Sequence, residues 1–325
     1  MKKLFLSLVA ALMAATATFA QSTLVATLTH GENVTMYYGT YALRDAHNAA
    51  ASGDVINLSG GGFQAVNITK AVTLRGTGID SQNPTVIANS FDINISETDS
   101  VRLSMEGIRC TGTVTMESTL TNAYFLKCLF SRIQCQKDVK KVLLTNCKVT
   151  NSAYLSGNIQ FVNSFVRECN GSATFVNCIV SNYHNGGSSP MTSSLLVNCI
   201  IFKESDYYYN TVALSESSVA YNCVAINYSN NYFDGNSANS NCSISSFAEI
   251  FKTYRGGYSN SETFEMTDSA KEMFLGNDNT QIGMYGGMLP YTSTPSYPQI
   301  TKMNVANKTT ADGKLSVEIE VSAAQ

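Results

Sequence analysis

The stretch ATFVNCIVSN, residues 173–182, recurs with small changes as SLLVNCIIFK at 194–203 and as SVAYNCVAIN at 218–227. In each copy an Asn-Cys pair separates two short apolar runs, and such runs bounded by polar turn formers are typical of β-strands. Self-similarity about every 20 residues predicts a repeat architecture, in which each unit stacks on the next. Because the units hold strand-like segments without helical periodicity, we predict a stack of coils whose strands pair in parallel.

The Asn of each pair is predicted to turn the chain between two strands of one coil. A tight bend needs the left-handed backbone conformation, which Gly adopts freely and Asn tolerates better than other residues. At the same turn of successive coils, the Asn amides are also expected to hydrogen bond one another along the stack. The residues assigned to this ladder are Asn146, Asn163, Asn177, Asn198 and Asn222.

The Cys that follows the turn is predicted to point into the narrow interior, because Cys is small and among the most often buried residue types. Neighbours in parallel strands lie about 4.8 Å apart, whereas the Cβ atoms of a disulfide lie about 3.5–4.5 Å apart, so we favour free thiols. The predicted column holds Cys128, Cys147, Cys178, Cys199 and Cys223, with Ser164 at one step.

Two alternatives for the nine cysteines stay open. One or two disulfides would fit the secretory setting proposed below, and the candidates outside the column are Cys110, Cys135, Cys169 and Cys242. A metal site is less favoured, because no C-x-x-C spacing occurs, and we predict none.

The N-terminus resembles a secretory leader. Lys2 and Lys3 precede the apolar run LFLSLVAALMAATATFA, which ends in small residues before Gln21. We therefore expect residues 1–20 to be a signal peptide, and the protein to be secreted, periplasmic or on the cell surface. No later run reaches the roughly 20 apolar residues of a membrane span, so no transmembrane segment is expected in the mature chain. A net charge of −3 without a basic patch argues against a nucleic-acid partner.

Two further segments carry a family resemblance. YALRDAHNAAASGDVINLSGGGFQAVNITKAVTLRGTG, residues 41–78, joins a short amphipathic helix to a Gly-Asp turn and a strand ending in VTLRGTG. It resembles the opening of the right-handed parallel β-helix, or pectate-lyase-like, superfamily. MTDSAKEMFLGNDNTQIGMYGGMLPY, residues 266–291, is similar to the final rung of many secreted β-helix proteins of Bacteroidetes.

This resemblance implies an all-β fold: a single-stranded right-handed parallel β-helix with an N-terminal cap helix and a short C-terminal β segment. Residues 21–40 are expected to form an N-terminal strand segment. The β-helix is expected over 41–290, with the cap helix at 41–51 and the final rung at about 266–290. Residues 291–325 are expected to form a C-terminal β tail around Asp312-Gly313, which would add to a sheet edge or begin a sandwich.

The superfamily implies carbohydrate chemistry, but its catalytic motifs are not in the sequence. The Asn-Thr-Asp, Gly-His-Gly and Arg-Ile-Lys strings of polygalacturonases do not occur, nor does the acidic Ca²⁺-binding group of pectate lyases. We therefore assign no catalytic residue and no cofactor, and we lean towards a protein without enzymatic activity.

Aromatic residues crowd two loops between late repeats, ESDYYYN at 204–210 and INYSNNYFDGNS at 226–237. Ring faces beside amide and carboxylate groups suit sugar binding, although the rings would equally serve to pack the loops against the coil. The predicted ligand-binding residues are Tyr183, His184, Asp206, Tyr207, Tyr208, Tyr209, Tyr228, Tyr232, Phe233 and Asp234.

We expect a secreted or cell-surface protein that binds a polysaccharide or other glycan and acts like an adhesin. A polysaccharide lyase or glycoside hydrolase with an unrecognised site, and a structural envelope protein, are the alternatives. The sequence makes no prediction about the oligomeric state.

Overall fold

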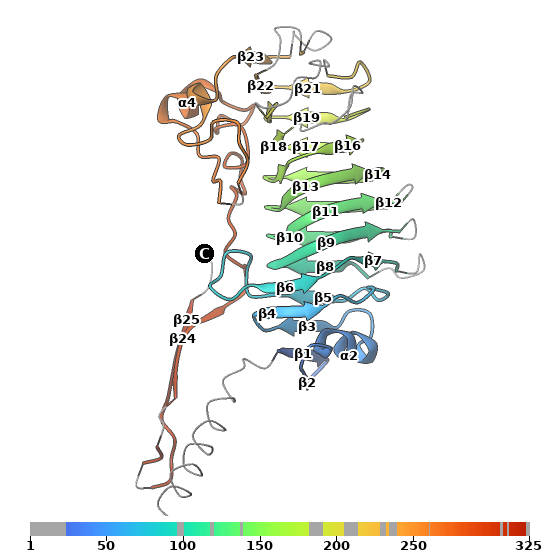
Figure 1. Cartoon of the computed structure of the whole chain (residues 1–325), viewed down its shortest axis with the longest axis vertical. Coiled ribbons are helices and arrows are strands. Elements are labelled where there is room, and N and C mark those ends of the chain that lie inside the picture. Colours follow the sequence, from blue (N-terminus) through green and yellow to red (C-terminus); the bar gives the residue numbers. More distant parts are fainter. Residues whose placement is uncertain are drawn as a thin grey trace, which may run out of the picture.

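The computed structural model describes residues 24–95, 101–117, 120–136, 139–181, 191–204, 214–227, 232–233, 239–259, 261–305, 308–310 and 312–322. Figure 1 shows a column of stacked coils along which two long sheets run. Each coil, or rung, adds one parallel strand to each sheet, and the Asn turn lies between the two strands. The chain is a right-handed parallel β-helix, which confirms the predicted fold class.

Sheet A contains the strands that precede the Asn turns, and an antiparallel pair closes it at the N-terminal end. Its strands follow in the order β2 (Asn33–Tyr38), β1 (Val25–His30), β3 (Val55–Leu58), β5 (Thr73–Arg75), β8 (Leu103–Glu106), β10 (Ala123–Leu126), β12 (Val139–Thr145), β14 (Gly157–Val162), β17 (Thr174–Val176), β19 (Leu195–Val197) and β21 (Val219–Tyr221).

Sheet B contains the strands that follow the turns. From the N-terminal end they are β4 (Gly61–Gln64), β6 (Thr85–Ala88), β9 (Ile108–Met116), β11 (Leu129–Cys135), β13 (Lys148–Leu155), β15 (Phe165–Val166), β18 (Ile179–Ser181), β20 (Ile200–Phe202), β22 (Val224–Ile226) and β23 (Cys242–Ile244). Two shorter strands, β7 (Phe91–Ile93) and β16 (Cys169–Gly171), pair with the far ends of β9 and β13.

The interior is built from residues that lie in register on successive strands. On sheet A one such column is fully buried and continuous from β3 to β21, because parallel pairing places equivalent residues directly above one another. Its members are Ile56, Leu74, Met105, Phe125, Leu144, Phe161, Phe175, Leu196 and Ala220.

Helix α2 (Ala42–Ala49) covers the N-terminal end of the column. Its inward face is apolar and buried, and includes Leu43 and Ala46. The ammonium group of Lys70 donates to the carbonyl oxygens of His47, Asn48 and Ala50 at 3.1, 2.7 and 2.7 Å. A cation that satisfies the last carbonyls of a helix also complements the helix dipole, so this lysine fixes the cap on the coil.

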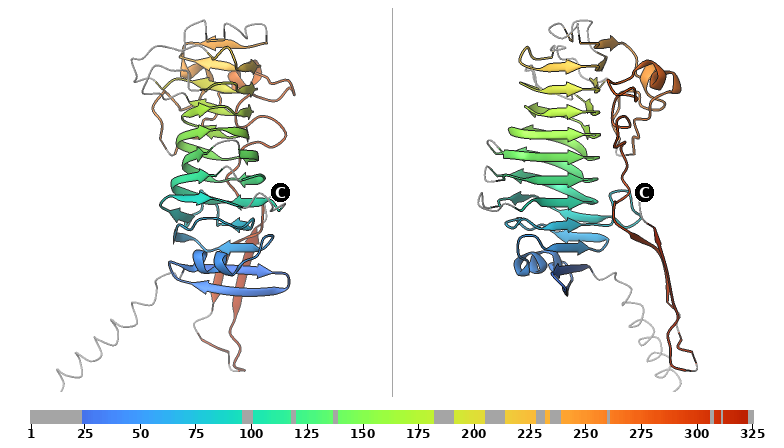
Figure 2. Two further views of the ribbon diagram at one scale, coloured as in Figure 1. Left: turned by 90° about the vertical axis from the view of Figure 1, so that its right-hand side faces the viewer. Right: turned by 180° about the vertical axis from the view of Figure 1, so that it is seen from behind.

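A second apolar core lies outside the coil, on the outer face of sheet B near its C-terminal end. It forms between outward side chains of sheet B, such as Phe165 and Phe202, and residues 247–259 and 261–284, which include α3 (Phe247–Ile250) and α4 (Asp268–Met273). In Figures 1 and 2 this orange segment lies beside the later rungs. Because it covers that face, strands β18, β20 and β22 are buried on both sides and consist of apolar residues almost throughout.

Residues 275–297, here called the strap, run back along the outside of the column towards its N-terminal end (Figure 1). The sequence predicted the final rung at about 266–290, but this segment contributes no strand to sheet A or sheet B, and β23 is the last strand of sheet B that the structure describes. The glycines that suggested a rung instead allow the strap to approach the Asn turns closely.

The C-terminal tail forms an antiparallel hairpin of β24 (Gln299–Val305) and β25 (Val317–Ser322). The two strands enclose Asp312-Gly313, where the sequence suggested a turn. Figures 1 and 2 show the hairpin standing beside the column and extending past its N-terminal end.

Candidate functional site

The Asn ladder forms the turns, and its amides bind the strap more than one another. The five asparagines have φ between 48° and 54°, as the left-handed bend requires. The amide nitrogen of Asn163 donates to the carbonyl oxygens of Met284 and Gly286 at 3.0 and 2.6 Å. Along the stack, Asn222 donates to the side chain of Asn198 at 3.5 Å.

The small residues that follow the Asn turns form a column whose side chains hydrogen bond along the stack as well as pack in the interior. The Cys199 thiol donates to the carbonyl oxygen of Val197 at 3.2 Å and accepts from the backbone N–H of Cys178 on the previous rung at 3.4 Å. The Ser164 hydroxyl makes the equivalent pair of contacts, with Val162 and Cys147. The position therefore needs a small side chain that both donates and accepts, which explains why Ser replaces Cys there.

The nine cysteines form no disulfide in the structure. Burial raises the pKa of the Cys147, Cys199 and Cys223 thiols, so they stay protonated and unreactive at neutral pH. In the described part of the chain, no group of three or more His, Cys, Asp or Glu side chains is placed to hold a metal ion. The Asn and Cys columns therefore have structural roles, the first in turns and the second in packing and hydrogen bonding.

Most of the predicted ligand-binding residues lie outside the described residues. These are Tyr183, His184, Asp206, Tyr207, Tyr208, Tyr209, Tyr228 and Asp234. The other two, Tyr232 and Phe233, are buried in the main core, where their rings meet edge to face at 5.0 Å. Neither ring presents a face to solvent, so these two fit the packing alternative.

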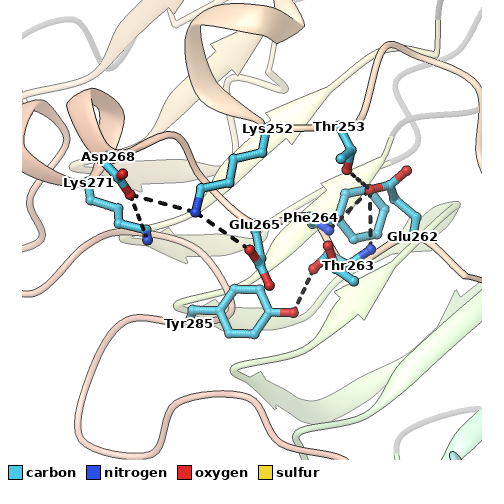
Figure 3. Close-up of polar contacts among 9 residues, drawn as sticks. All are labelled: Lys252, Thr253, Glu262, Thr263, Phe264, Glu265, Asp268, Lys271 and Tyr285. Atoms are coloured by element: carbon cyan, nitrogen blue, oxygen red, sulfur yellow. Dashed lines mark hydrogen bonds and ion pairs between the residues drawn. The ribbon is translucent and has the colours of Figure 1, made fainter.

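A network of charged and polar side chains lies on the outer segment (Figure 3). Lys252 reaches Glu265 and Asp268 at 3.7 Å each, and Lys271 reaches Asp268 at 3.3 Å. Glu262 accepts from Thr253 and from the backbone of Thr263 and Phe264. Each carboxylate in the network has a partner within the segment, so the network holds the segment together.

The buried acid Glu204 is also committed to structure. Its carboxylate accepts two hydrogen bonds from the Arg167 guanidinium at 3.0 Å each, and a third from the Ser181 hydroxyl at 2.9 Å. The guanidinium lies 4.9 Å from the centre of the Tyr258 ring. This bidentate ion pair, enclosed by Tyr258, ties the outer segment to sheet B. The Glu204 carboxylate is therefore fully engaged in structural hydrogen bonds.

A hollow of about 300 Å³ on the outer face of sheet A has the groups expected of a binding site. It spans four neighbouring strands, β8, β10, β12 and β14. Its polar lining comes from two rows of residues that alternate with the buried column. The first row consists of Arg102, Asn122, Lys141 and Asn158, and the second row contains Tyr124 and Gln160.

The residues of the first row immediately precede Leu103, Ala123, Val142 and Ile159, which pair with one another in register. The row therefore offers one polar group on each of four rungs, spaced by the strand separation of about 4.8 Å.

Lys141 owes its position to a β-bulge. The pairing of β12 with β14 shifts register between Val139 and Val142, and Lys141 takes the left-handed conformation with φ of 50°. For a lysine such a conformation costs on the order of 1–3 kcal/mol, and bulges beside functional sites often redirect a side chain. The bulge places Lys141 in the lining of the hollow at this energetic cost.

Arg102 and Tyr124 form a pair at the other end of the hollow. The guanidinium lies 5.0 Å from the centre of the Tyr124 ring, within cation–π range. Burial raises the pKa of Tyr124, so its hydroxyl stays protonated at neutral pH. Among the described residues, neither Arg102 nor Lys141 has a carboxylate within ion-pair distance, and no carboxylate lines the hollow.

The sequence carries a signal for this site, although no known motif covers it. Each residue of the row stands five positions before a turn residue: Gly107, Lys127, Asn146 and Asn163. The same offset from the next three turns gives Ser172, Ser193 and Ser217. Because the turn residues mark the same place on each rung, a fixed offset from them locates the outward-facing positions of sheet A. At four of these positions the side chain is Arg, Lys or Asn.

Comparisons with protein-family models, with curated proteins and with solved structures gave no match. The family resemblance read from residues 41–78 and 266–291 therefore stays a prediction, whereas the β-helix itself is seen in the structure. In the part of the chain that is described, no helix is both long and apolar enough to cross a bilayer.

Proposed function

We propose that this chain is a glycan-binding protein of the cell exterior, and that it holds an acidic polysaccharide along the outer face of sheet A. The observation that carries the proposal is the hollow over β8–β14, with two cations that lack a carboxylate partner among the described residues. The expected signal peptide and the resemblance to secreted β-helix proteins of Bacteroidetes support an extracellular setting.

The chemistry of the lining favours an anionic ligand. Arg102 offers a planar guanidinium suited to two hydrogen bonds with a carboxylate or sulfate group, and Lys141 offers a mobile ammonium. The amides of Asn122, Asn158 and Gln160 can both donate to and accept from sugar hydroxyls. A row with one group per rung suits an extended polymer lying along the column, with its charges repeated along the chain.

Binding is favoured over hydrolysis because the hollow lacks the pair of carboxylates that glycoside hydrolysis requires. Lyase chemistry needs a base, and the raised pKa of Tyr124 makes its hydroxyl a poor one near neutral pH. The arrangement provides charge, hydrogen bonds and a shaped surface, and its lining holds no carboxylate pair.

Calorimetry with polygalacturonate, a sulfated glycosaminoglycan and neutral dextran tests the proposal. We expect the purified protein to bind one or both acidic polymers and not dextran, with affinity that falls as salt is added. Arg102→Ala and Lys141→Ala should each weaken binding about tenfold, the equivalent of about 1.4 kcal/mol for one charged contact.

Matched controls come from exposed or half-exposed residues outside the hollow. Lys140→Ala removes the exposed lysine that precedes Lys141, and Arg132→Ala removes an arginine on sheet B that also lies over a tyrosine, Tyr154. Both should bind as the wild type does. Binding that is unchanged in Arg102→Ala and Lys141→Ala would refute the site, and release of unsaturated or reducing sugar would show that the protein is an enzyme.

A further inference from the structure

The C-terminal hairpin presents an apolar strip that is exposed in the described part of the structure. All six residues of β25 are exposed. Val317, Ile319 and Val321 alternate along the strand, so they share one face, and each is about half exposed. A two-stranded hairpin alone in water is marginally stable and usually needs a further strand or surface against its apolar face.

A second apolar strip lies at the opposite end of the chain. Strand β2 is the edge of sheet A, and its residues Val34, Met36 and Tyr38 alternate on the outer face with 60%, 55% and 63% exposure. The intervening Tyr37 packs against the main core. The strips on β2 and β25 thus match in length and in spacing, with three apolar side chains each over a strand of six residues.

The position of the hairpin indicates which partner can contact both the β25 strip and the β2 strip. Figures 1 and 2 show that the hairpin extends past β2 at the N-terminal end of the column and stands away from it. The surface within its reach therefore lies beyond the cap of its own chain. A second copy that approaches cap to cap brings its own β2 into that space.

We propose that two copies of this chain associate cap to cap, with the hairpin strip of each copy, Val317, Ile319 and Val321, packed on the β2 strip of the other, Val34, Met36 and Tyr38. The contact is made twice around a two-fold axis, as closed homodimers require. Pairing the strips buries six exposed apolar side chains at each contact, and removing apolar area from water is the main favourable term in association.

Light scattering after size-exclusion chromatography tests the dimer on protein expressed without the expected leader, residues 1–20. We expect a mass twice that of the chain. Ile319→Glu and Met36→Lys should each halve the mass, because either places a charge in the contact. Met288→Glu makes a matched apolar-to-charge change at an exposed residue outside both strips, and it should leave the dimer intact.

Mixing the two disrupted variants gives the decisive result. A copy with Glu at 319 and a copy with Lys at 36 form one contact between the two new charges and one contact of wild-type sequence. We therefore expect the mixture to recover the doubled mass that neither variant shows alone. The recovery would also show that both variants are folded.

Several outcomes would overturn the proposal. A wild-type protein of single mass would show that the strips do not associate. Loss of the dimer in Ile319→Glu but not in Met36→Lys would assign the contact to two hairpins, and the reverse would assign it to two β2 strands. A dimer that survives both changes would be held by another surface.

Discussion

A Cβ atom added to Gly287 would lie 2.1 Å from the side-chain amide nitrogen of Asn177, so strap and turn are in contact and the buried Asn177 side chain would have to shift to admit it. Gly287 also has φ of +71°, a conformation that other residues adopt with strain. We predict that Gly287→Ala lowers the free energy of unfolding by about 2–4 kcal/mol, since backbone strain and a steric clash add. Urea unfolding followed by circular dichroism measures the loss.

Gly31→Ala is the matched control for that experiment. Gly31 has φ of +57°, and no atom lies within 4 Å of the position its Cβ would take. This variant carries the strain without the clash, so it should cost only about 1 kcal/mol. Equal losses in the two variants would mean that the strap does not press on the Asn turns.

The second prediction concerns the thiol column. Cys199→Ser keeps a donor for the Val197 carbonyl and an acceptor for the Cys178 N–H, so it should change stability by less than about 1 kcal/mol. Cys199→Ala removes both; the Val197 carbonyl still accepts from the Asn177 N–H at 2.9 Å, but the buried Cys178 N–H loses its acceptor, which should cost about 1–3 kcal/mol. Thermal unfolding of the two variants in parallel separates hydrogen bonding from packing, and equal losses would show that packing alone explains the column.

The third prediction concerns Lys127, which occupies the turn position that Asn holds on later rungs. It has φ of 52° and is buried, and burial lowers its pKa. Lys127→Asn should stabilise the protein by about 1 kcal/mol, because Asn tolerates this conformation and needs no buried charge. Lys140→Asn on the exposed surface should have no such effect. A destabilised Lys127→Asn would show that the lysine makes a needed interaction there.

The fourth prediction is a pH dependence that arises in the cap. Burial, and next the nearby Lys70 ammonium, lower the pKa of His47 to about 4. The unfolded chain, with an ordinary His pKa of about 6.5, therefore binds more protons than the fold between pH 6.5 and 4. Stability from this group is complete above pH 6.5 and falls as the pH drops towards 4, by about 2 kcal/mol at pH 5.

Comparing His47→Gln with the wild type isolates that term, because Gln can still accept from the Thr69 N–H that His47 binds at 3.3 Å. The wild type should lose about 2 kcal/mol more than the variant between pH 7.5 and pH 5. Parallel losses in the two proteins would show that His47 does not control the acid limb of the stability curve.

The repeat was predictable because its cause is local. A left-handed turn favours Asn, and a narrow interior favours a small residue, so both recur in the sequence on the later rungs, from Asn146 to Asn222. The same turns define which residues of sheet A face outward, and the row of Arg102, Asn122, Lys141 and Asn158 could have been read at a fixed offset before them. The row was not predicted because solvent-exposed strand positions accept almost any polar residue, so these four side chains form no motif of their own.

The path of the strap was not predictable in the same way. Residues 266–290 carry glycines and short apolar segments that suit a rung, and nothing local says that the chain leaves the column at this point. The cause lies elsewhere in the sequence, in strands such as IIF at 200–202 and VAI at 224–226, which are apolar on both faces. Such strands require a second layer, and the segment after the last rung provides it.

The strap has a consequence for how the chain folds. A plain solenoid joins only neighbouring rungs, so it can grow from any point and fray from either end. Here the hydroxyl of Tyr297 binds the carbonyl oxygen of Gly76, 221 residues away, while Asn277 binds Asn198 near the other end. These contacts raise the contact order of the fold, and we expect them to form after most of the column. Closing them last would join loosely coupled rungs into one cooperative unit, and we expect the two ends of the column to unfold together.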